Sequence, residues 1–386
     1  MEKISKLWSN ENFRNIFFQV LVFAGVFYVL FFFYENVSEH LNKSKIASGF
    51  GYLEHEASFD ISESLIEYSH SDSYARLYVA GALNTIFVAV IGIFFSIIVG
   101  VVVGVLRLSK NWLLDKLAYI YTELVRNTPL LLLLFYCYSV LTEFLPTPKE
   151  AISIIPGFFL SNRGLAFPEM NDHFVWNTLP LMVLLGFFVA IFARRKFLKI
   201  QELTGKYYPS GYLFILLPIL FPFLIWAFGG APTEYTIPKL SRFNFEGGNF
   251  VSPEFMALAT GLIVHTSANV AEIIRSGILA VNKGQWEAAR SLGLKEGLIM
   301  HLVIFPQAFR VIIPPLTNQM LNLTKNSSLA IAIGYPDFVA VSNTSMNQTG
   351  QAIEGIMLIM LFYLTLSLST SFFMNWFNSK TKLVER

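Results

Sequence analysis

Long runs of apolar residues dominate the chain, and polar residues gather in the stretches between them. A bilayer core of about 30 Å requires roughly 20 apolar residues in a helix, because each helical residue rises by about 1.5 Å. The runs are unbroken, unlike the short alternating segments of membrane β-strands. We therefore expect an all-α, polytopic transmembrane protein of about eight spans, at residues 16–34, 80–106, 121–145, 175–193, 212–229, 255–275, 308–324 and 352–377.

Composition agrees with a membrane protein. Hydrophobic residues make up 54% of the 386 residues and charged residues only 14%, whereas about 25% charged residues is usual in a soluble domain. The first apolar run lacks a small-residue cleavage site and is followed by acidic sequence, so we expect an anchor helix rather than a cleaved signal peptide. A single cysteine, Cys137, excludes an intrachain disulfide and a cysteine-based metal site.

Positive charge is distributed unequally between the predicted loops. With a cytoplasmic amino terminus, most of the 28 lysines and arginines fall on or beside the inner face, as the positive-inside rule requires. We therefore expect both termini to be cytoplasmic, and segments 35–76 and 230–254 to lie outside. No basic patch with interleaved aromatic residues is present, so no nucleic-acid partner is expected.

The loop between the sixth and seventh predicted spans is rich in charged residues: EAARSLGLKEGLIMHLVIFP, residues 287–306. The residues EAAR favour a helix. Gly293 can adopt a left-handed conformation that ends this helix, and residues 295–304 start another. The pattern predicts a short helix, a sharp turn and a second helix near the membrane surface, an arrangement suited to docking in a groove of a partner.

The spacing of this loop also resembles a known motif. EAA is followed by three residues, Gly293, nine residues, Val303, one residue, Phe305 and Pro306. This resembles the EAA loop of ABC-importer permeases, whose pattern ends in Ile-x-Leu-Pro; Val303 and Phe305 are conservative departures. An ordinary connecting loop is the alternative. The resemblance implies a coupling helix seated in a cleft of a cytoplasmic ATPase subunit, with Glu287, Ala288, Ala289, Arg290, Gly293 and Pro306 as the coupling residues.

Other segments resemble the same group of proteins. ELVRNTPLLLLLFY, residues 123–136, is similar to the Arg-x-Thr-Pro-Leu segment of polar amino-acid permeases of the histidine and glutamine type. Residues 271–294 and 305–329 are also similar to that family. The resemblance implies a type I importer core of five helices. The three extra spans and FFLSNRGLAFP, residues 158–168, resemble the long-form membrane subunit of general L-amino-acid or glutamate/glutamine/aspartate/asparagine importers.

This organisation predicts four segments along the chain. They are an anchor helix with a periplasmic segment at 1–76, the first part of the core at 77–145, an insertion with two extra spans and periplasmic loops at 146–254, and the second part of the core with the cytoplasmic EAA loop at 255–386. Gly100 and Gly104 would allow close helix approach in the second span. Pro314 and Pro315 are expected to break or kink the seventh span.

No motif for catalysis is visible in the sequence. The only Gly-Lys pair, Gly205–Lys206, lacks the glycine and hydroxyl positions of a phosphate-binding loop. The six histidines lack metal-ligand spacing. We therefore expect no catalytic residue, metal or cofactor in this chain, with ATP and Mg²⁺ bound by a partner ATPase.

Polar residues inside the spans are candidates for the substrate path, because burying an ionisable group in hydrocarbon costs at least about 2.5 kcal/mol. Hydrogen bonding between helices and snorkelling of long side chains are the structural alternatives. Local ion pairs are also possible between Glu123 and Arg126 and between Glu272 and Arg275, each three residues apart. The candidates are His265, Asn269, Glu272, Lys325, Asn326 and Ser327.

The resemblance implies the permease subunit of an ATP-driven ABC importer for polar L-amino acids in the bacterial inner membrane. The implied partners are two copies of a cytoplasmic ABC ATPase, a second homologous permease forming a heterodimer, and a periplasmic amino-acid-binding protein. An ion-gradient-driven secondary amino-acid transporter is the alternative, and a membrane scaffold is a third. A secondary transporter predicts interrupted helices in both halves of a repeated fold, and the sequence shows no such repeat.

Overall fold

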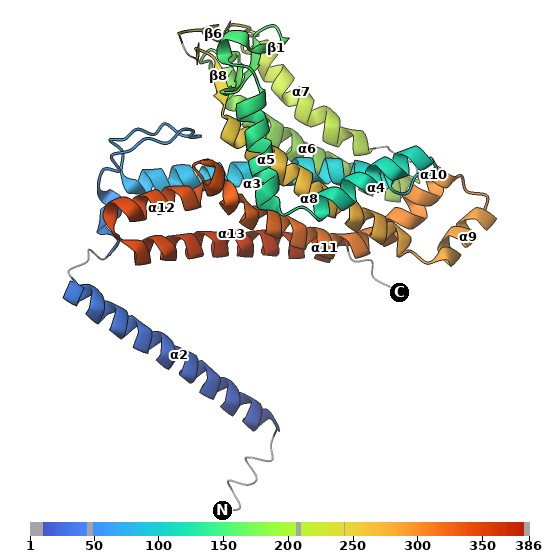
Figure 1. Cartoon of the computed structure of the whole chain (residues 1–386). Helices are drawn as coiled ribbons and strands as arrows, with labels where there is room; N and C mark the ends of the chain where they lie inside the picture. The colour runs from blue at the N-terminus through green and yellow to red at the C-terminus, as the bar shows by residue number, and fades with distance from the viewer. Residues whose placement is uncertain (1–10, 45–48, 206–209, 243, 382–386) are drawn as a thin grey trace, which may run out of the picture. The chain divides into compact units, whose positions relative to one another are not determined.

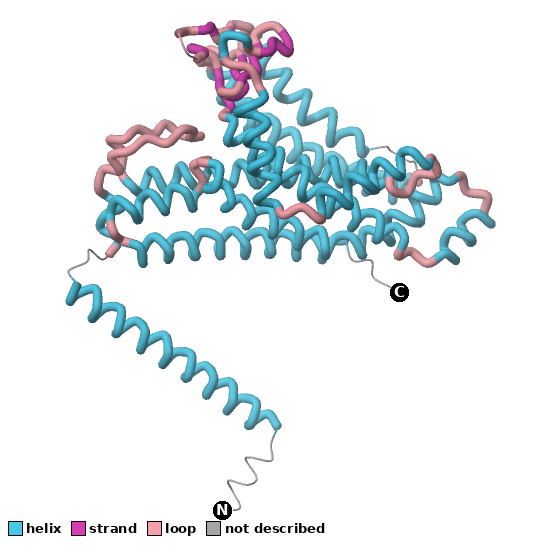
Figure 2. The backbone as a smooth tube through the Cα atoms, in the orientation of Figure 1, coloured by secondary structure: helices cyan, strands magenta, loops and turns pink. Residues whose placement is uncertain are grey.

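The computed structural model describes residues 11–44, 49–205, 210–242 and 244–381, and helices dominate it (Figures 1 and 2). The chain divides into two compact units, one of residues 1–131 with 261–386 and one of residues 132–260. The main helices are α2 (Glu11–Ser44), α3 (Tyr74–Leu106), α4 (Trp112–Arg126), α5 (Leu130–Ser139), α6 (Phe174–Thr204), α7 (Leu213–Phe228), α8 (Pro253–Leu279), α9 (Lys283–Ser291), α10 (Glu296–Ile299), α11 (Phe305–Asn326), α12 (Phe338–Thr349) and α13 (Ala352–Thr381).

Membrane-length helices account for most of the predicted spans. Among the described residues, seven helices are long and apolar enough to cross a membrane, or up to eight if a bent pair counts as one span. The window 175–193 falls inside α6, which has 31 residues. The prediction of a helical, polytopic membrane protein is confirmed.

The span expected at 121–145 is interrupted in the structure. Helices α4 and α5 bend by 105° at the break between them. Pro129 lies in this break and has no backbone N–H to donate, and a proline also disfavours helical geometry at the residue before it, Thr128. The RNTPL sequence is therefore the corner between two helices rather than the middle of one.

Helices α3 and α8 approach closely at two glycines. A Cβ atom at Gly100 would lie 2.5 Å from Cγ1 of Val270, and one at Gly104 would lie 2.7 Å from the carbonyl oxygen of Ala271. Real Cβ atoms do not tolerate such distances. The predicted close approach is confirmed, and it brings α8 onto the second span.

The expected break or kink at Pro314 and Pro315 is not a break, because α11 remains helical from Phe305 to Asn326; a kink there stays a prediction. A proline ring fits the helical φ angle, but it removes an N–H bond and crowds the carbonyl of the residue four positions earlier. Buried Ile312 lies against Gly277 of α8. This packing helps to hold α11 together through the proline pair.

Residues 50–73 fold against one end of α3 and against α12, a short helix that was not predicted. Tyr52, Tyr78 and Phe338 belong to one buried cluster, and the hydroxyls of Tyr52 and Tyr78 lie 3.1 Å apart. The Nδ2 of Asn84 donates to the carbonyl oxygens of Glu63 (2.9 Å) and Pro336 (3.0 Å). The buried side-chain amide of Asn84 thus joins α3 to the segment 50–73 and to the residues just before α12.

A fully buried carboxyl begins α12. Asp337 accepts a hydrogen bond from the Ala340 N–H at 2.8 Å and one from the Tyr363 hydroxyl at 3.3 Å. Burial raises the pKa of Asp337 to about 7, well above the ordinary value of about 3.9. The folded protein therefore holds this proton to higher pH than the unfolded chain.

We predict that the thermal midpoint in detergent falls as pH rises from 5 to 8. The protonated carboxyl is favoured below the folded pKa, and ionisation while buried removes up to about 2–3 kcal/mol of stability between pH 5 and pH 8. Asp337→Asn keeps a good helix cap and should flatten this dependence. The exposed Asp60→Asn variant should retain it. A wild-type midpoint independent of pH would contradict the prediction.

In the unit of residues 132–260, α6 and α7 form a helical hairpin in which a Cβ at Gly186 would lie 2.6 Å from the carbonyl oxygen of Leu217. Short strands, expected as loops, form three small antiparallel sheets. Runs of two to four residues are too short for a periodic pattern. The strands are β1 (Ile152–Ile155), β2 (Phe158–Ser161), β3 (Gly164–Phe167) and β8 (Asn249–Val251) in order β1-β2-β3-β8, then β4 (Glu169–Met170) with β5 (Tyr235–Thr236), and β6 (Lys239–Leu240) with β7 (Phe245–Glu246).

Candidate functional site

Helix α9 carries the EAA sequence. The side chain of Asn282 caps it by accepting a hydrogen bond from the Gly284 N–H at 2.8 Å. At the other end Gly293 has a φ of +70°. The Gly293 N–H donates to the Arg290 carbonyl (2.9 Å) and the Leu294 N–H to the Ala289 carbonyl (3.3 Å), which is the Schellman pattern of a helix end. The predicted left-handed stop at Gly293 is confirmed.

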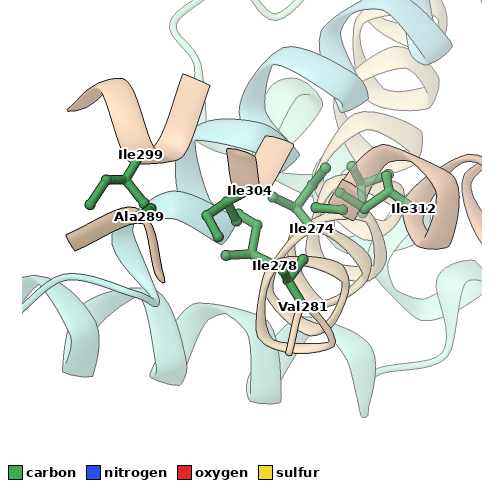
Figure 3. Close-up of a cluster of buried hydrophobic side chains, with 9 residues drawn as sticks. Ile274, Ile278, Val281, Ala289, Ile299, Ile304 and Ile312 are labelled. Carbon is green, nitrogen blue, oxygen red and sulfur yellow. The ribbon is translucent and has the colours of Figure 1, made fainter. Parts of the chain in front are cut away.

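One face of α9 is buried in an apolar cluster (Figure 3). Ala289 is 3% exposed and faces Ile299 of the following helix. A larger residue at this buried position would have to displace its apolar neighbours. Besides Ala289, the cluster contains Val270, Ile274, Ile278, Val281, Ile299, Ile304, Ala308 and Ile312. The cluster fastens α9 to α8 and α11.

The other face of α9 is open. Glu287 and Ala288 are exposed, and Leu292 is 79% exposed. Beside this face, a groove of 380 Å³ is lined by residues that include Trp286 and Glu287. A short helix with one buried alanine and an acidic, apolar outer face is a surface that can enter a cleft of a partner.

Arg290, a predicted coupling residue, is engaged within its own loop. Its Nη2 lies 3.0 Å from Oε1 of Glu296, and its guanidinium lies 5.8 Å from the Trp286 ring. Both charged side chains are more than half exposed, so the pair contributes at most about 1 kcal/mol. Its geometric effect is to hold the turn after α9 closed.

The predicted second helix of the loop does begin, at Glu296, and its place near the membrane surface stays a prediction. Helix α10 continues through a π-helical turn at 300–304 directly into α11. Pro306 is exposed in the first turn of α11, where the missing N–H of a proline is tolerated. Gln307 of α11 reaches back to Gln285 of α9, with Nε2 and Oε1 3.2 Å apart.

We predict that Gly293→Ala destabilises the end of α9 by about 1–2 kcal/mol, because an alanine strains the left-handed conformation. Gly297→Ala is the matched control, since Gly297 lies in α10 with nothing within 4 Å and no positive φ. Hydrogen exchange of the α9 amides should accelerate about tenfold in the first variant and stay unchanged in the second. Equal exchange in both variants would contradict this role of Gly293.

Among the polar residues around His265 on α8, Ser267 contacts another helix, whereas Asn269 bonds within α8. The Tyr121 hydroxyl of α4 lies 2.7 Å from Ser267 Oγ and 3.0 Å from the Val264 carbonyl, a contact that was not predicted. Asn269 donates to the carbonyl of His265 at 3.1 Å. His265 is half-buried. Hydrogen bonding between helices, the structural alternative for this cluster, is therefore present at Ser267.

Glu272 forms the predicted ion pair with Arg275, whose Nη2 lies 2.7 Å from Oε1. Oε2 of Glu272 also lies 3.7 Å from Nη1 of Arg107. The sequence pattern did not suggest this second partner. Glu123 accepts a hydrogen bond from Asn127 at 3.4 Å; in the described part of the chain no ion pair joins it to Arg126.

Lys325, Asn326 and Ser327 end α11 and differ in their surroundings. Lys325 is exposed and Asn326 half-buried. Ser327 is fully buried, and its hydroxyl donates to the Thr324 carbonyl at 2.7 Å. Within the described ranges, no hydrogen bond or ion pair joins these three to the candidates on α8.

Comparison with known proteins places the chain among characterised relatives. A family model described as a binding-protein-dependent transport system inner membrane component matches residues 174–383. The chain is 44% identical over 377 residues to the general L-amino acid transport system permease protein AapQ of Rhizobium johnstonii, covering 98% of this chain and 94% of that protein. It is 43% identical over 389 residues to the putative amino-acid ABC transporter permease protein YhdX of Escherichia coli, covering 100% and 98%.

A third relative and one solved structure complete the comparison. The glutamate/glutamine/aspartate/asparagine transport system permease protein BztB of Rhodobacter capsulatus is 36% identical over 421 residues, covering 100% of this chain and 97% of that protein. A crystal structure of an amino acid ABC transporter with histidines matches with a TM-score of 0.47 at 20% identity, covering 80% of this chain and 95% of that chain.

Proposed function

Because the chain belongs to the family of binding-protein-dependent transport system inner membrane components, we propose that it is the permease subunit of an ATP-driven importer of polar L-amino acids. The resemblance inferred from the sequence is confirmed by the same matches. The substrate class rests on the names of full-length relatives, which are amino-acid permeases. Family membership does not favour the ion-gradient-driven alternative.

The observation that carries the coupling proposal is the two-faced geometry of α9. Ala289 is buried against α8 and α11, whereas Glu287 and Leu292 are exposed. A partner that holds the exposed face can therefore move α8 and α11 as one body with α9. ATP-driven closure of the ATPase subunits would shift the permease between inward-open and outward-open states by contacting α9 differently in each state.

The proposed assembly has partners on both faces of the membrane. Two copies of a cytoplasmic ABC ATPase bind ATP and Mg²⁺ and contact α9, and a periplasmic binding protein delivers the amino acid. A second homologous permease completes the path as a heterodimer partner, and both termini lie in the cytoplasm. The long form of the chain supports the heterodimer, because the similarity to AapQ and BztB extends over almost all of it.

Lys325 is the charged residue that we place on the substrate path. It is exposed on α11, and in the described part of the chain no carboxylate pairs with it. A free cation attracts the carboxylate that every amino acid carries. Lys325→Gln should raise the KM for uptake about tenfold with little change in kcat, which uptake kinetics would measure; Lys325→Arg should retain most of the affinity. An unchanged KM in the glutamine variant would remove Lys325 from the path.

Mass spectrometry of the complex purified from native membranes in mild detergent tests the proposed assembly. We expect an ABC ATPase and a second permease to co-purify with this chain. Recovery of the chain without an ATPase, under conditions that preserve other membrane complexes, would contradict the proposal.

A further inference from the structure

An arginine at the end of α3 joins three helices. The guanidinium of Arg107 is 11% exposed. Its Nη1 donates to the Thr122 hydroxyl at 2.8 Å, and its centre lies 4.9 Å from the Tyr119 ring, both on α4. The Arg107 cluster, as we define it, consists of Arg107, Asp115, Thr122, Glu272 and Arg275.

Two carboxylates on different helices share this guanidinium. Asp115 of α4 lies 3.7 Å from its Nε, and Glu272 of α8 lies 3.7 Å from its Nη1. Both distances exceed a good hydrogen bond. The buried Nε has no hydrogen-bond partner. Arg107 is therefore held between two acceptors without a hydrogen bond to either, which leaves room for it to favour one or the other.

Charge in the cluster is balanced. Glu272 already accepts three hydrogen bonds from Arg275, the shortest of them at 2.7 Å. Because Arg275 already pairs with Glu272, Glu272 needs Arg107 less than Asp115 does. In the described structure the ion-pair partner of Asp115 is Arg107. A small displacement of α8 relative to α4 would change which carboxylate lies nearer to Arg107. If Arg107 moves toward Asp115, Glu272 keeps its bonds to Arg275; if it moves toward Glu272, Asp115, whose side chain is 39% exposed, is left to solvent.

The cluster adjoins the packing around α9. Leu108, the residue after Arg107, packs against the buried cluster that contains Ala289. Glu272 lies between Val270 and Ile274 on α8, and both belong to that same cluster. A force on α9 that moves these apolar contacts therefore also moves both ends of the Arg107–Glu272 contact.

We propose that Arg107 is a positioning residue for transport, which links movement of α9 and α8 to α4 by shifting between Glu272 and Asp115. The inference rests on the proposed function and extends it to a group outside the EAA loop. Arg107 would then have two discrete arrangements, one nearer to Glu272 and one nearer to Asp115. Coupling between distant sites requires an element with two such states.

The test uses the complete transporter in proteoliposomes with its binding protein, and compares Arg107→Gln with Lys116→Gln. Lys116 also lies over the Tyr119 ring, at 5.4 Å, but is exposed and joins neither carboxylate in the described structure. We expect Arg107→Gln to retain its ATPase subunits and to lower the amino acid transported per ATP hydrolysed by about fivefold or more. Lys116→Gln should keep the wild-type ratio.

Milder variants keep the inference testable if Arg107→Gln does not assemble. Arg107→Lys retains the positive charge but lacks the planar guanidinium, which can contact α4 and α8 together. This variant should give an intermediate ratio of amino acid transported to ATP hydrolysed. Thr122→Val removes only the 2.8 Å hydrogen bond and should lower the ratio less. If each assembled Arg107 or Thr122 variant transports with the wild-type ratio, the inference is overturned. Absence of ATP-dependent transport by the wild type would instead overturn the proposed function.

Discussion

Replacing Glu287 by arginine is expected to abolish ATP-dependent amino-acid uptake while leaving the chain folded. Glu287 is exposed on α9, and within the described residues its side chain makes no hydrogen bond or ion pair; its backbone carbonyl accepts a bond from Ser291 Oγ at 3.0 Å. The substitution should therefore change the stability of the folded chain little. A reversed charge at the centre of a docking surface weakens association by about 2 kcal/mol or more, which is about 30-fold in affinity.

Co-purification and uptake measured together check this prediction. Glu202→Arg is the matched control, because Glu202 is exposed near the end of α6, belongs to the other unit of the chain, and undergoes the same change of charge. We expect the ATPase to be lost only from the Glu287 variant. Normal uptake by Glu287→Arg would show that the outer face of α9 is not the ATPase contact.

Gly104→Leu should prevent stable folding of α3 against α8. A Cβ at Gly104 would lie 2.7 Å from the Ala271 carbonyl oxygen and 2.9 Å from Cβ of Ile274. Neither atom can rotate away, because one belongs to the backbone and the other is fixed to it. Overpacking typically costs about 1–3 kcal/mol, and separation of the two helices would raise this to at least about 3 kcal/mol.

Thermal unfolding in detergent, followed by size-exclusion chromatography, would measure this effect. Gly25→Leu makes the same change on α2 at a glycine with nothing within 4 Å of the added Cβ, and should be neutral. An unfolding midpoint of Gly104→Leu equal to that of the control would mean that α3 and α8 are not packed as described.

The helices that sequence analysis located are those in which apolar residues continue for the thickness of a bilayer. The chain corner at Pro129 was missed because apolar residues continue on both sides of it, so hydropathy alone does not separate α4 from α5. Helix α12 was missed for the opposite reason: FVAVSNTSMNQT contains too few apolar residues to stand out. The four-stranded sheet is completed by pairing between β3 and β8, which lie far apart in the chain.

Sequence analysis predicted the turn after α9 better than it predicted the contacts between helices. The left-handed stop at Gly293 follows from local rules, because a turn is defined by neighbouring residues. The burial of Ala289 was not predicted, because it depends on packing against α8 and α11. The Arg107 cluster joins α3, α4 and α8, and no local spacing brings Arg107 to Glu272. Likewise, Ser327 seemed a path residue by its position after an apolar helix, but burial and a bond to Thr324 turn its hydroxyl to its own helix.

Uptake of a labelled L-amino acid into proteoliposomes that contain this chain, its permease partner and the ATPase, with binding protein outside the vesicles and ATP inside, tests the central claim most directly. We predict uptake that requires ATP and binding protein and persists when ionophores remove every ion gradient. Uptake that proceeds without ATP and stops with the ionophores would contradict the account and identify an ion-gradient-driven transporter.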